Sequence, residues 1–148
     1  MSATALDGID DHSVDFIFQS SVLEEYSSTD LMRETFREFH RVLRPTGKVM
    51  IVTGSEELPK GTWASFTYPD RGKALQSGTQ VRCAVRNSDI VFSDYYWIDS
   101  DLASAFVAGG LEVVLHHQPL TKGDEPFQWY DEIERSPWSV YVLKRKSG

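Results

Sequence analysis

The chain has a single cysteine and no long hydrophobic run, and each absence excludes a class of protein. Cys83 is the only cysteine among 148 residues, so the sequence forms neither an internal disulfide framework nor a cysteine-rich zinc site. No apolar run approaches the roughly 20 residues that cross a bilayer. Residues 1–7 lack the basic and apolar regions of a signal peptide. These features predict a cytoplasmic protein without a membrane partner.

Basic residues are also too few for a nucleic-acid partner. Fifteen Lys and Arg stand against 22 Asp and Glu, which gives a net charge of -7. Nonspecific nucleic-acid binding depends on a basic face that neutralises phosphates, so this balance argues against it. The hydrophobic content of 41% and charged content of 25% are typical of globular proteins. The length then predicts one domain that covers residues 1–148.

The first half of the chain reads as strand, helix, strand. Val14–Phe18 is a short apolar run typical of a strand buried on both faces. Apolar residues then recur at helical spacing, with Ser27 expected to cap the helix and Pro45 and Gly47 expected to end it. Lys48–Thr53 reads as a second buried strand. This order predicts a right-handed parallel βαβ unit.

The second half begins with a stretch that has no regular period. Residues 54–97 mix glycine, proline and aromatic side chains, and we interpret them as an ordered lid or substrate-region insertion. Within it, the alternation at 81–85 predicts a half-exposed strand that residues 89–97 continue as a hairpin. Asp99 is expected to cap a short helix. Two further strands are expected at 111–116 and 138–143.

Two motifs in the first half resemble a known family. Residues 11–24 read Asp-His-Ser-Val-Asp-Phe-Ile-Phe-Gln-Ser-Ser-Val-Leu-Glu, and residues 41–47 read Arg-Val-Leu-Arg-Pro-Thr-Gly. In that order they resemble the class I S-adenosylmethionine-dependent methyltransferases, in the small-molecule, type 11-like branch. Gly-Gly-Leu-Glu-Val-Val at 109–114 extends the resemblance. Glu25 and Thr46 depart from the family, which often has His and Gly at these positions.

The resemblance implies an α/β fold that is the carboxyl-terminal half of the family's domain. We expect a partial Rossmann-like, doubly wound sheet, mostly parallel with an antiparallel last strand, that lacks the family's N-terminal strands. The family's first strand and glycine-rich loop would lie before Met1. Val14–Phe18 would then have an open apolar edge, and such an edge invites pairing with a second chain.

The resemblance also suggests residues for a cofactor site. The backbone of Ala3 would approach the adenine of S-adenosylmethionine, and Gln19, Ser20 and Ser21 would line its methionine part. The alternative interpretation is that Gln19–Ser21 merely end a strand.

Four aromatic residues are candidates for the acceptor pocket, namely Trp63, Tyr95, Tyr96 and Trp97. Flat apolar side chains suit a planar or hydrophobic acceptor, although packing in the core explains such residues equally well. No metal site is expected. No catalytic residue is identified, because methyl transfer depends mainly on alignment and needs no fixed triad.

The function implied by the resemblance is methyl transfer from S-adenosylmethionine to a small aromatic or hydrophobic acceptor. The isolated chain is expected to be inactive or weakly active, because each lost hydrogen bond to a charged cofactor group costs about 1.5–3 kcal/mol of binding. The alternative is a noncatalytic partner or regulatory subunit that completes or steers a related methyltransferase. A nicotinamide oxidoreductase is disfavoured because no G-x-G-x-x-G follows a strand.

Overall fold

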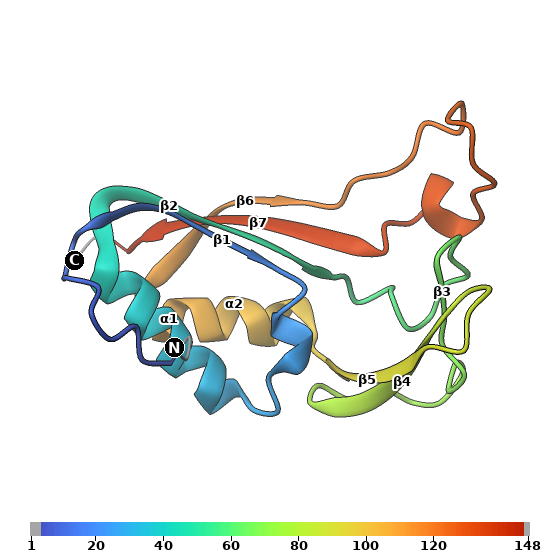
Figure 1. Cartoon of the computed structure of the whole chain (residues 1–148), viewed down its shortest axis with the longest axis horizontal. Coiled ribbons are helices and arrows are strands. Elements are labelled where there is room, and N and C mark those ends of the chain that lie inside the picture. Colours follow the sequence, from blue (N-terminus) through green and yellow to red (C-terminus); the bar gives the residue numbers. More distant parts are fainter. Residues whose placement is uncertain (1–3, 147–148) are drawn as a thin grey trace.

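The computed structural model describes residues 4–146, which form two β-sheets and two α-helices (Figure 1). The main elements are β1 (Val14–Ser20), α1 (Thr29–Val42), β2 (Leu43–Gly54), β3 (Phe66–Thr67), β4 (Thr79–Val85), β5 (Val91–Tyr96), α2 (Asp99–Ala108), β6 (Leu111–His117) and β7 (Trp138–Arg145). Short 3₁₀ helices, η1 (Leu23–Glu25) and η2 (Asp131–Ile133), lie after β1 and before β7. No helix in residues 4–146 is long and apolar enough to span a membrane.

The larger sheet has the strand order β1-β2-β7-β6. Strands β1 and β2 are parallel, as the βαβ pattern predicts, and β7 is antiparallel to both β2 and β6. The α/β class and the antiparallel last strand are therefore observed. The prediction of a mostly parallel sheet is not confirmed, because β7 inserts between β2 and β6 and makes two of the three pairings antiparallel.

The start and end of α1 differ from the sequence-based expectation. Ser28, not Ser27, is the N-cap, and its side chain accepts a hydrogen bond from the Leu31 N–H at 3.3 Å. The helix ends at Val42 and the chain passes directly into β2, so Pro45 and Gly47 lie within the strand. The pairing of β1 with β2 shifts register in this part, and no residue of β1 pairs with Pro45. The strand therefore tolerates a proline, which has no backbone N–H to donate.

Both helices pack on one face of the larger sheet and form the main core with it (Figure 1). Phe106 of α2 packs edge-on against Phe36 of α1 at 4.9 Å and against Tyr141 of β7 at 5.3 Å between ring centroids. Gly109 lets the two helices approach, because a side chain there would collide with Phe36. Asp99 is the first residue of α2 rather than its N-cap, and its carboxylate accepts the Tyr141 hydroxyl at 2.6 Å.

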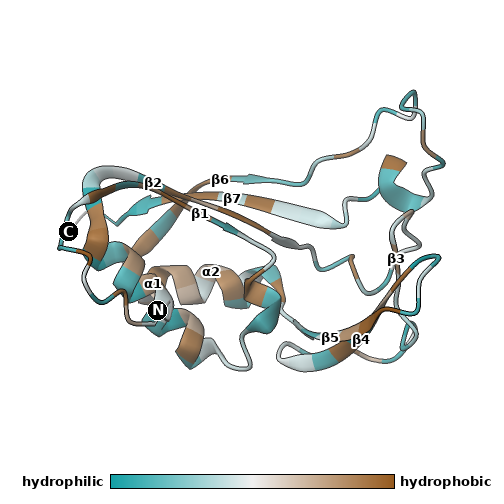
Figure 2. Cartoon of the chain, in the orientation of Figure 1, coloured by the Kyte–Doolittle hydropathy of each residue, from teal (hydrophilic) through white to brown (hydrophobic). Residues whose placement is uncertain are grey.

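No helix covers the opposite face of this sheet in the part of the chain that the structure describes (Figure 1). Phe18, Met50, Val142 and Leu115 pair successively across all four strands, so their side chains share one face. Phe18 is 59% exposed and Leu115 is 52% exposed. Figure 2 shows hydrophobic stretches in these strands, alternating with hydrophilic ones. We call this surface the bare face.

The smaller sheet, β3-β4-β5, is antiparallel and has a core of its own. The hairpin expected at 81–97 is present as β4 and β5, and Asn87 in its turn has a positive φ of 57°. Val81 and Cys83 of β4 are buried with Trp63, Tyr68 and other residues of the 54–97 segment. This sheet adjoins the end of the larger sheet at which β2 terminates (Figure 1).

Candidate functional site

The candidate site lies at the carboxyl ends of β1 and β2. In open α/β sheets the ligand crevice lies beyond the carboxyl ends of parallel strands. Ser21, directly after β1, has a positive φ of 52°, and its N–H donates to the Val52 carbonyl at 2.9 Å. This left-handed turn carries the chain sharply from the strand into η1, which brings Glu24 to the end of β2.

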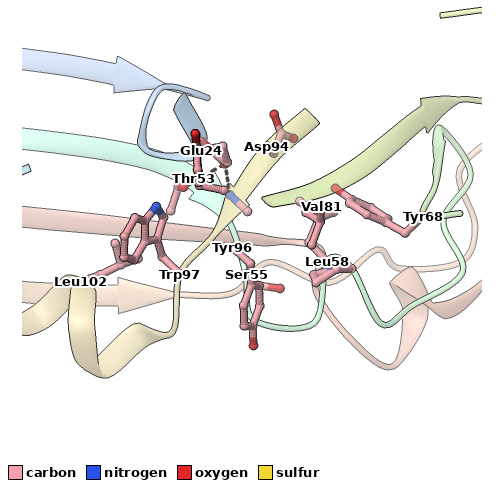
Figure 3. Close-up of a pocket in the computed structure, with 13 residues that line it drawn as sticks. Glu24, Thr53, Ser55, Leu58, Tyr68, Val81, Asp94, Tyr96, Trp97 and Leu102 are labelled. Atoms are coloured by element: carbon pink, nitrogen blue, oxygen red, sulfur yellow. Dashed lines mark hydrogen bonds between the residues drawn. The ribbon is translucent and has the colours of Figure 1, made fainter. Parts of the chain in front are cut away.

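Two carboxylates face a hollow between the strand ends and the β4–β5 hairpin (Figure 3). Glu24, Leu58, Tyr68 and Asp94 line both of two cavities there, with volumes of about 30 and 90 Å³. We call this pair of cavities the carboxylate pocket. Its size fits a functional group of a ligand but not a whole aromatic ring, since an apolar cavity that holds benzene measures about 150 Å³.

Glu24 is held in place by one of its two oxygens. Its Oε1 accepts hydrogen bonds from the Thr53 hydroxyl at 2.9 Å and from the Gly54 N–H. Its Oε2 is buried and has no hydrogen-bond partner among the described residues. Because a buried acceptor without a partner costs about 1–3 kcal/mol, this oxygen is available to an N–H or O–H donor of a ligand.

Asp94 of β5 is the titratable group of the pocket. Burial, reinforced by the negative charges of Glu24 and Glu25, raises the pKa of its carboxyl to about 6. A carboxylate with this pKa can take up a proton near neutral pH, as a general base must. Asp94 can therefore accept the proton that an N–H or O–H nucleophile loses.

The thiol of Cys83 and the hydroxyl of Tyr68, which also line the pocket, stay neutral at neutral pH. Burial raises the pKa of the Cys83 thiol to about 11, and burial also raises the pKa of the Tyr68 hydroxyl far above its usual range. A thiol reacts as its thiolate, so Cys83 is not a nucleophile at neutral pH. No group of three or more His, Cys, Asp or Glu side chains in residues 4–146 is arranged to hold a metal ion.

The residues predicted to bind the cofactor do not lie together in one site. Ala3 lies outside the described residues. Gln19 is buried on the helix-covered face, where its amide nitrogen lies 3.4 Å from the Tyr26 hydroxyl and its Oε1 has no partner. Ser20 is exposed, and Ser21 lines the carboxylate pocket. The far edge of β1, beside these residues, has no neighbouring strand in the described chain.

The residues predicted to line an acceptor pocket also divide into two sets. Tyr95, Tyr96 and Trp97 all line the carboxylate pocket, and the Trp97 indole N–H donates to the Tyr26 carbonyl at 3.2 Å. Trp63 is 1% exposed, donates its indole N–H to the Leu58 carbonyl at 2.6 Å and lines a different cavity. The four aromatic residues therefore do not form one wall.

Sequence reasoning did not identify Glu24 and Asp94 as site residues. The sequence does not reveal the role of Glu24, because its contacts with Thr53 and Gly54 cross about 30 residues of sequence. The alternation of buried and exposed residues in the hairpin could have shown that Asp94 faces inward. Asp94 pairs with buried Val81, so its side chain lies on the inner face of the β4–β5 pair.

Comparison with known proteins identifies the fold. Residues 1–51 match the family model of a methyltransferase domain. A structure of an S-adenosylmethionine-dependent methyltransferase from Clostridium acetobutylicum is similar to 99% of this chain, with 11% identity and a TM-score of 0.65, over 63% of its own length. A putative S-adenosylmethionine-dependent methyltransferase from Listeria monocytogenes is similar over 99% of this chain and 68% of its own, with 9% identity and a TM-score of 0.67.

A third structure holds bound ligands. The 1,6-didemethyltoxoflavin-N1-methyltransferase from Burkholderia thailandensis, solved with 1,6-didemethyltoxoflavin and S-adenosylhomocysteine, is similar over 99% of this chain and 49% of its own, with 13% identity and a TM-score of 0.55. The chain thus spans less than two thirds of the Clostridium protein and about half of the Burkholderia protein. No curated protein sequence matches it. The chain has the fold of the S-adenosylmethionine-dependent methyltransferases, and its residues 1–51 match the sequence model of a methyltransferase domain.

Proposed function

We propose that this chain is part of a methyltransferase that uses S-adenosylmethionine and methylates a small aromatic or hydrophobic acceptor. The observation that carries the proposal is the carboxylate pocket, which lies at the carboxyl ends of β1 and β2 in a methyltransferase fold. S-adenosylmethionine supplies an activated methyl group when it is bound. The 1,6-didemethyltoxoflavin bound to the similar Burkholderia protein supports a small-molecule acceptor.

The residues of the pocket have distinct roles in this proposal. The free Glu24 Oε2 would orient the acceptor by accepting a hydrogen bond from an N–H or O–H other than the one that reacts. Asp94 would take the proton of the reacting N–H or O–H as the bond from that atom to the methyl carbon forms and the sulfur–methyl bond of the cofactor breaks, with the cofactor sulfur as leaving group. Tyr95, Tyr96 and Trp97 exclude water from the same space, and alignment of donor and acceptor supplies most of the rate enhancement.

The test of the catalytic role is methyl transfer at a saturating cofactor concentration, followed by mass spectrometry of an added phenol and aromatic amine panel. Asp94→Asn is expected to lower the rate about 10²- to 10⁴-fold, the usual contribution of a general base. Asp89→Asn, in the exposed turn of the same hairpin, serves as the matched control and retains the rate. Equal rates for the two variants would contradict the role of Asp94.

We further propose that the cofactor site of this chain is incomplete without additional strands beside β1. The open β1 edge, the bare face and the greater length of the similar proteins support this proposal. Calorimetry with S-adenosylmethionine tests it directly, with a dissociation constant of about 1 mM or weaker expected for the 148-residue chain. A micromolar constant would contradict the incomplete site while leaving methyl transfer intact.

A second candidate function follows from the same exposed surface. The chain would be a noncatalytic partner that pairs through β1 with a related methyltransferase and completes or steers it. Phe18→Glu adds charge to the bare face beside that edge, so it is expected to abolish self-association or partner binding at about 10–100 µM in sedimentation experiments. Ile90→Glu, at an equally exposed site on the hairpin, is the matched control. A parent chain that stays monomeric and binds no methyltransferase would exclude this candidate.

A further inference from the structure

A second, larger cavity lies on the other side of Phe66 and Trp138 from the carboxylate pocket. Its volume is about 280 Å³, and Trp63, Phe66, Trp129 and Trp138 supply its aromatic lining. The lining comes from β3 and the segment before it, from the start of β7 and from the long connection between β6 and β7. We call it the aromatic cavity.

Its volume matches a ring system rather than a single functional group. An apolar cavity of about 150 Å³ holds a benzene molecule. The aromatic cavity, at about 280 Å³, accommodates a larger ring system such as an indole, whereas the cavities of the carboxylate pocket, at about 30 and 90 Å³, do not. A whole ring system therefore fits inside the aromatic cavity, whereas the carboxylate pocket admits only the reacting functional group of an acceptor.

The aromatic side chains are held in place before any ligand binds. The Trp63 indole N–H donates to the Leu58 carbonyl at 2.6 Å, and the Trp129 indole N–H donates to the Glu125 carboxylate at 3.1 Å. Phe66 and Trp138 meet edge to face at 6.3 Å between ring centroids. Fixed rings provide flat apolar surfaces for stacking at little cost in conformational entropy.

The polar groups of the lining define the charge and hydrogen bonding of the ligand. Both oxygens of buried Glu132 are occupied by backbone N–H groups, those of Ala64 and Tyr130, so this residue places a fixed negative charge in the wall. Thr121 also lines the cavity, and its hydroxyl is buried without a hydrogen-bond partner among the described residues. A buried hydroxyl without a partner is unfavourable in free energy, and a ligand group that forms a hydrogen bond with it removes this penalty.

We propose that the aromatic cavity binds a planar aromatic group that is uncharged or positively charged and carries a hydrogen-bonding substituent for Thr121. This binding goes beyond the proposed function, because it requires neither the cofactor nor methyl transfer. Phe66 and Trp138 line both the aromatic cavity and the carboxylate pocket, so a ring bound here lies one side-chain layer from Asp94.

The test is ligand-observed NMR titration of the 148-residue chain, without cofactor, with four indoles that differ in one group. Tryptophol carries a neutral hydroxyl, tryptamine a cation, indole-3-acetate an anion, and 3-ethylindole no polar substituent. Tryptophol and tryptamine are expected to bind with dissociation constants of about 1 mM or tighter. Indole-3-acetate is expected to bind at least fivefold more weakly because of Glu132.

Two variants locate the binding. Trp129→Ala removes a partly exposed wall and is expected to weaken tryptophol binding about fivefold or more. Thr121→Val keeps the shape of the side chain and is expected to weaken tryptophol severalfold while 3-ethylindole is unaffected. Ile90→Ala, exposed on the hairpin turn, is the matched control and retains binding of all four probes.

Three results would overturn the proposal. The first is that the chain, shown by circular dichroism to be folded, binds none of the probes at a probe concentration about five times the expected dissociation constant. The second is binding that Trp129→Ala and Thr121→Val leave unchanged. The third is tighter binding of indole-3-acetate than of tryptamine. Because the assay contains no S-adenosylmethionine, each result is independent of whether the chain transfers methyl groups.

Discussion

The two faces of the larger sheet both carry apolar side chains, but helices cover only one of them in the described chain. One face packs against α1 and α2, and Phe106 and Leu143 are completely buried there. The other face presents Phe18, Met50 and Leu115 without a helix over them in the described chain. Burial of apolar area stabilises a protein by about 25 cal/mol per Å², so the bare face represents unused stabilisation. This difference supports the proposal that further polypeptide covers the bare face.

The largest predicted effect comes from matched truncations of one phenylalanine on each face. Phe106→Ala leaves a cavity in the main core and is expected to lower the free energy of unfolding by about 3–5 kcal/mol. Phe18→Ala, at a largely exposed site, is expected to cost less than about 1 kcal/mol. Urea denaturation measures both values. Equal losses would mean that the bare face is covered in solution.

A hydrogen bond provides the next comparison between the faces. Tyr141 points to the covered face and donates to the Asp99 carboxylate, whereas its neighbour Val142 points to the bare face. Tyr141→Phe removes a bond to a charged group and is expected to cost about 1.5–3 kcal/mol. Val142→Thr is expected to cost less than about 1 kcal/mol. Thermal unfolding of the two variants tests this order, and a larger loss for Val142→Thr would reverse the assignment of faces.

For Asp94, in β5 of the smaller sheet, we expect a smaller effect on stability and of opposite sign. Its folded-state pKa of about 6 exceeds the ordinary value of 3.8, so folding favours the protonated form and stability falls as pH rises from about 4 to 6. Asp94→Asn is therefore expected to increase the free energy of unfolding at pH 7.5 by about 1 kcal/mol, a value reduced for partial exposure. Most of this gain disappears at pH 4. A destabilised Asp94→Asn at pH 7.5, with Asp89→Asn as control, would contradict the raised pKa.

The smallest predicted effect concerns the ion pair between Arg44 and Asp15, which joins β2 to β1 at 2.8 Å. Both side chains are largely exposed, so solvent screens their attraction. Asp15→Asn is expected to change the free energy of unfolding by less than about 0.5 kcal/mol, and 1 M salt should remove even that difference. A loss above 1 kcal/mol in urea denaturation would show that β1 depends on this pair for its attachment to the sheet.

Local sequence patterns predicted the elements of this fold well and their exact ends less well. Helical spacing located α1 and alternation located the β4–β5 hairpin, because both periods reflect one buried face. The end of α1 was misplaced because Pro45 and Gly47 usually terminate helices. In the structure Gly47 is required by close packing, since a Cβ there would lie 2.7 Å from the Leu43 side chain.

Only part of the candidate site could be predicted from the sequence, because some of its residues meet through contacts that are distant along the chain. Ser21, Tyr95, Tyr96 and Trp97 lie near strand ends, and strand ends are visible in the sequence. Glu24 and Asp94 are about 70 residues apart and meet only because the hairpin folds over the end of β2. The separation of Trp63 into another cavity likewise depends on the fold of the connection between β6 and β7.

The amino-acid sequence by itself determined the α/β class, the parallel β1–β2 unit and the family pattern in residues 1–51, because periodicity and short motifs are local properties of the chain. Only the tertiary structure decided where β7 inserts, which face of the sheet stays bare and which carboxylates share a pocket. Those features depend on contacts between residues distant in sequence, and no local pattern encodes the register or depth at which such residues meet.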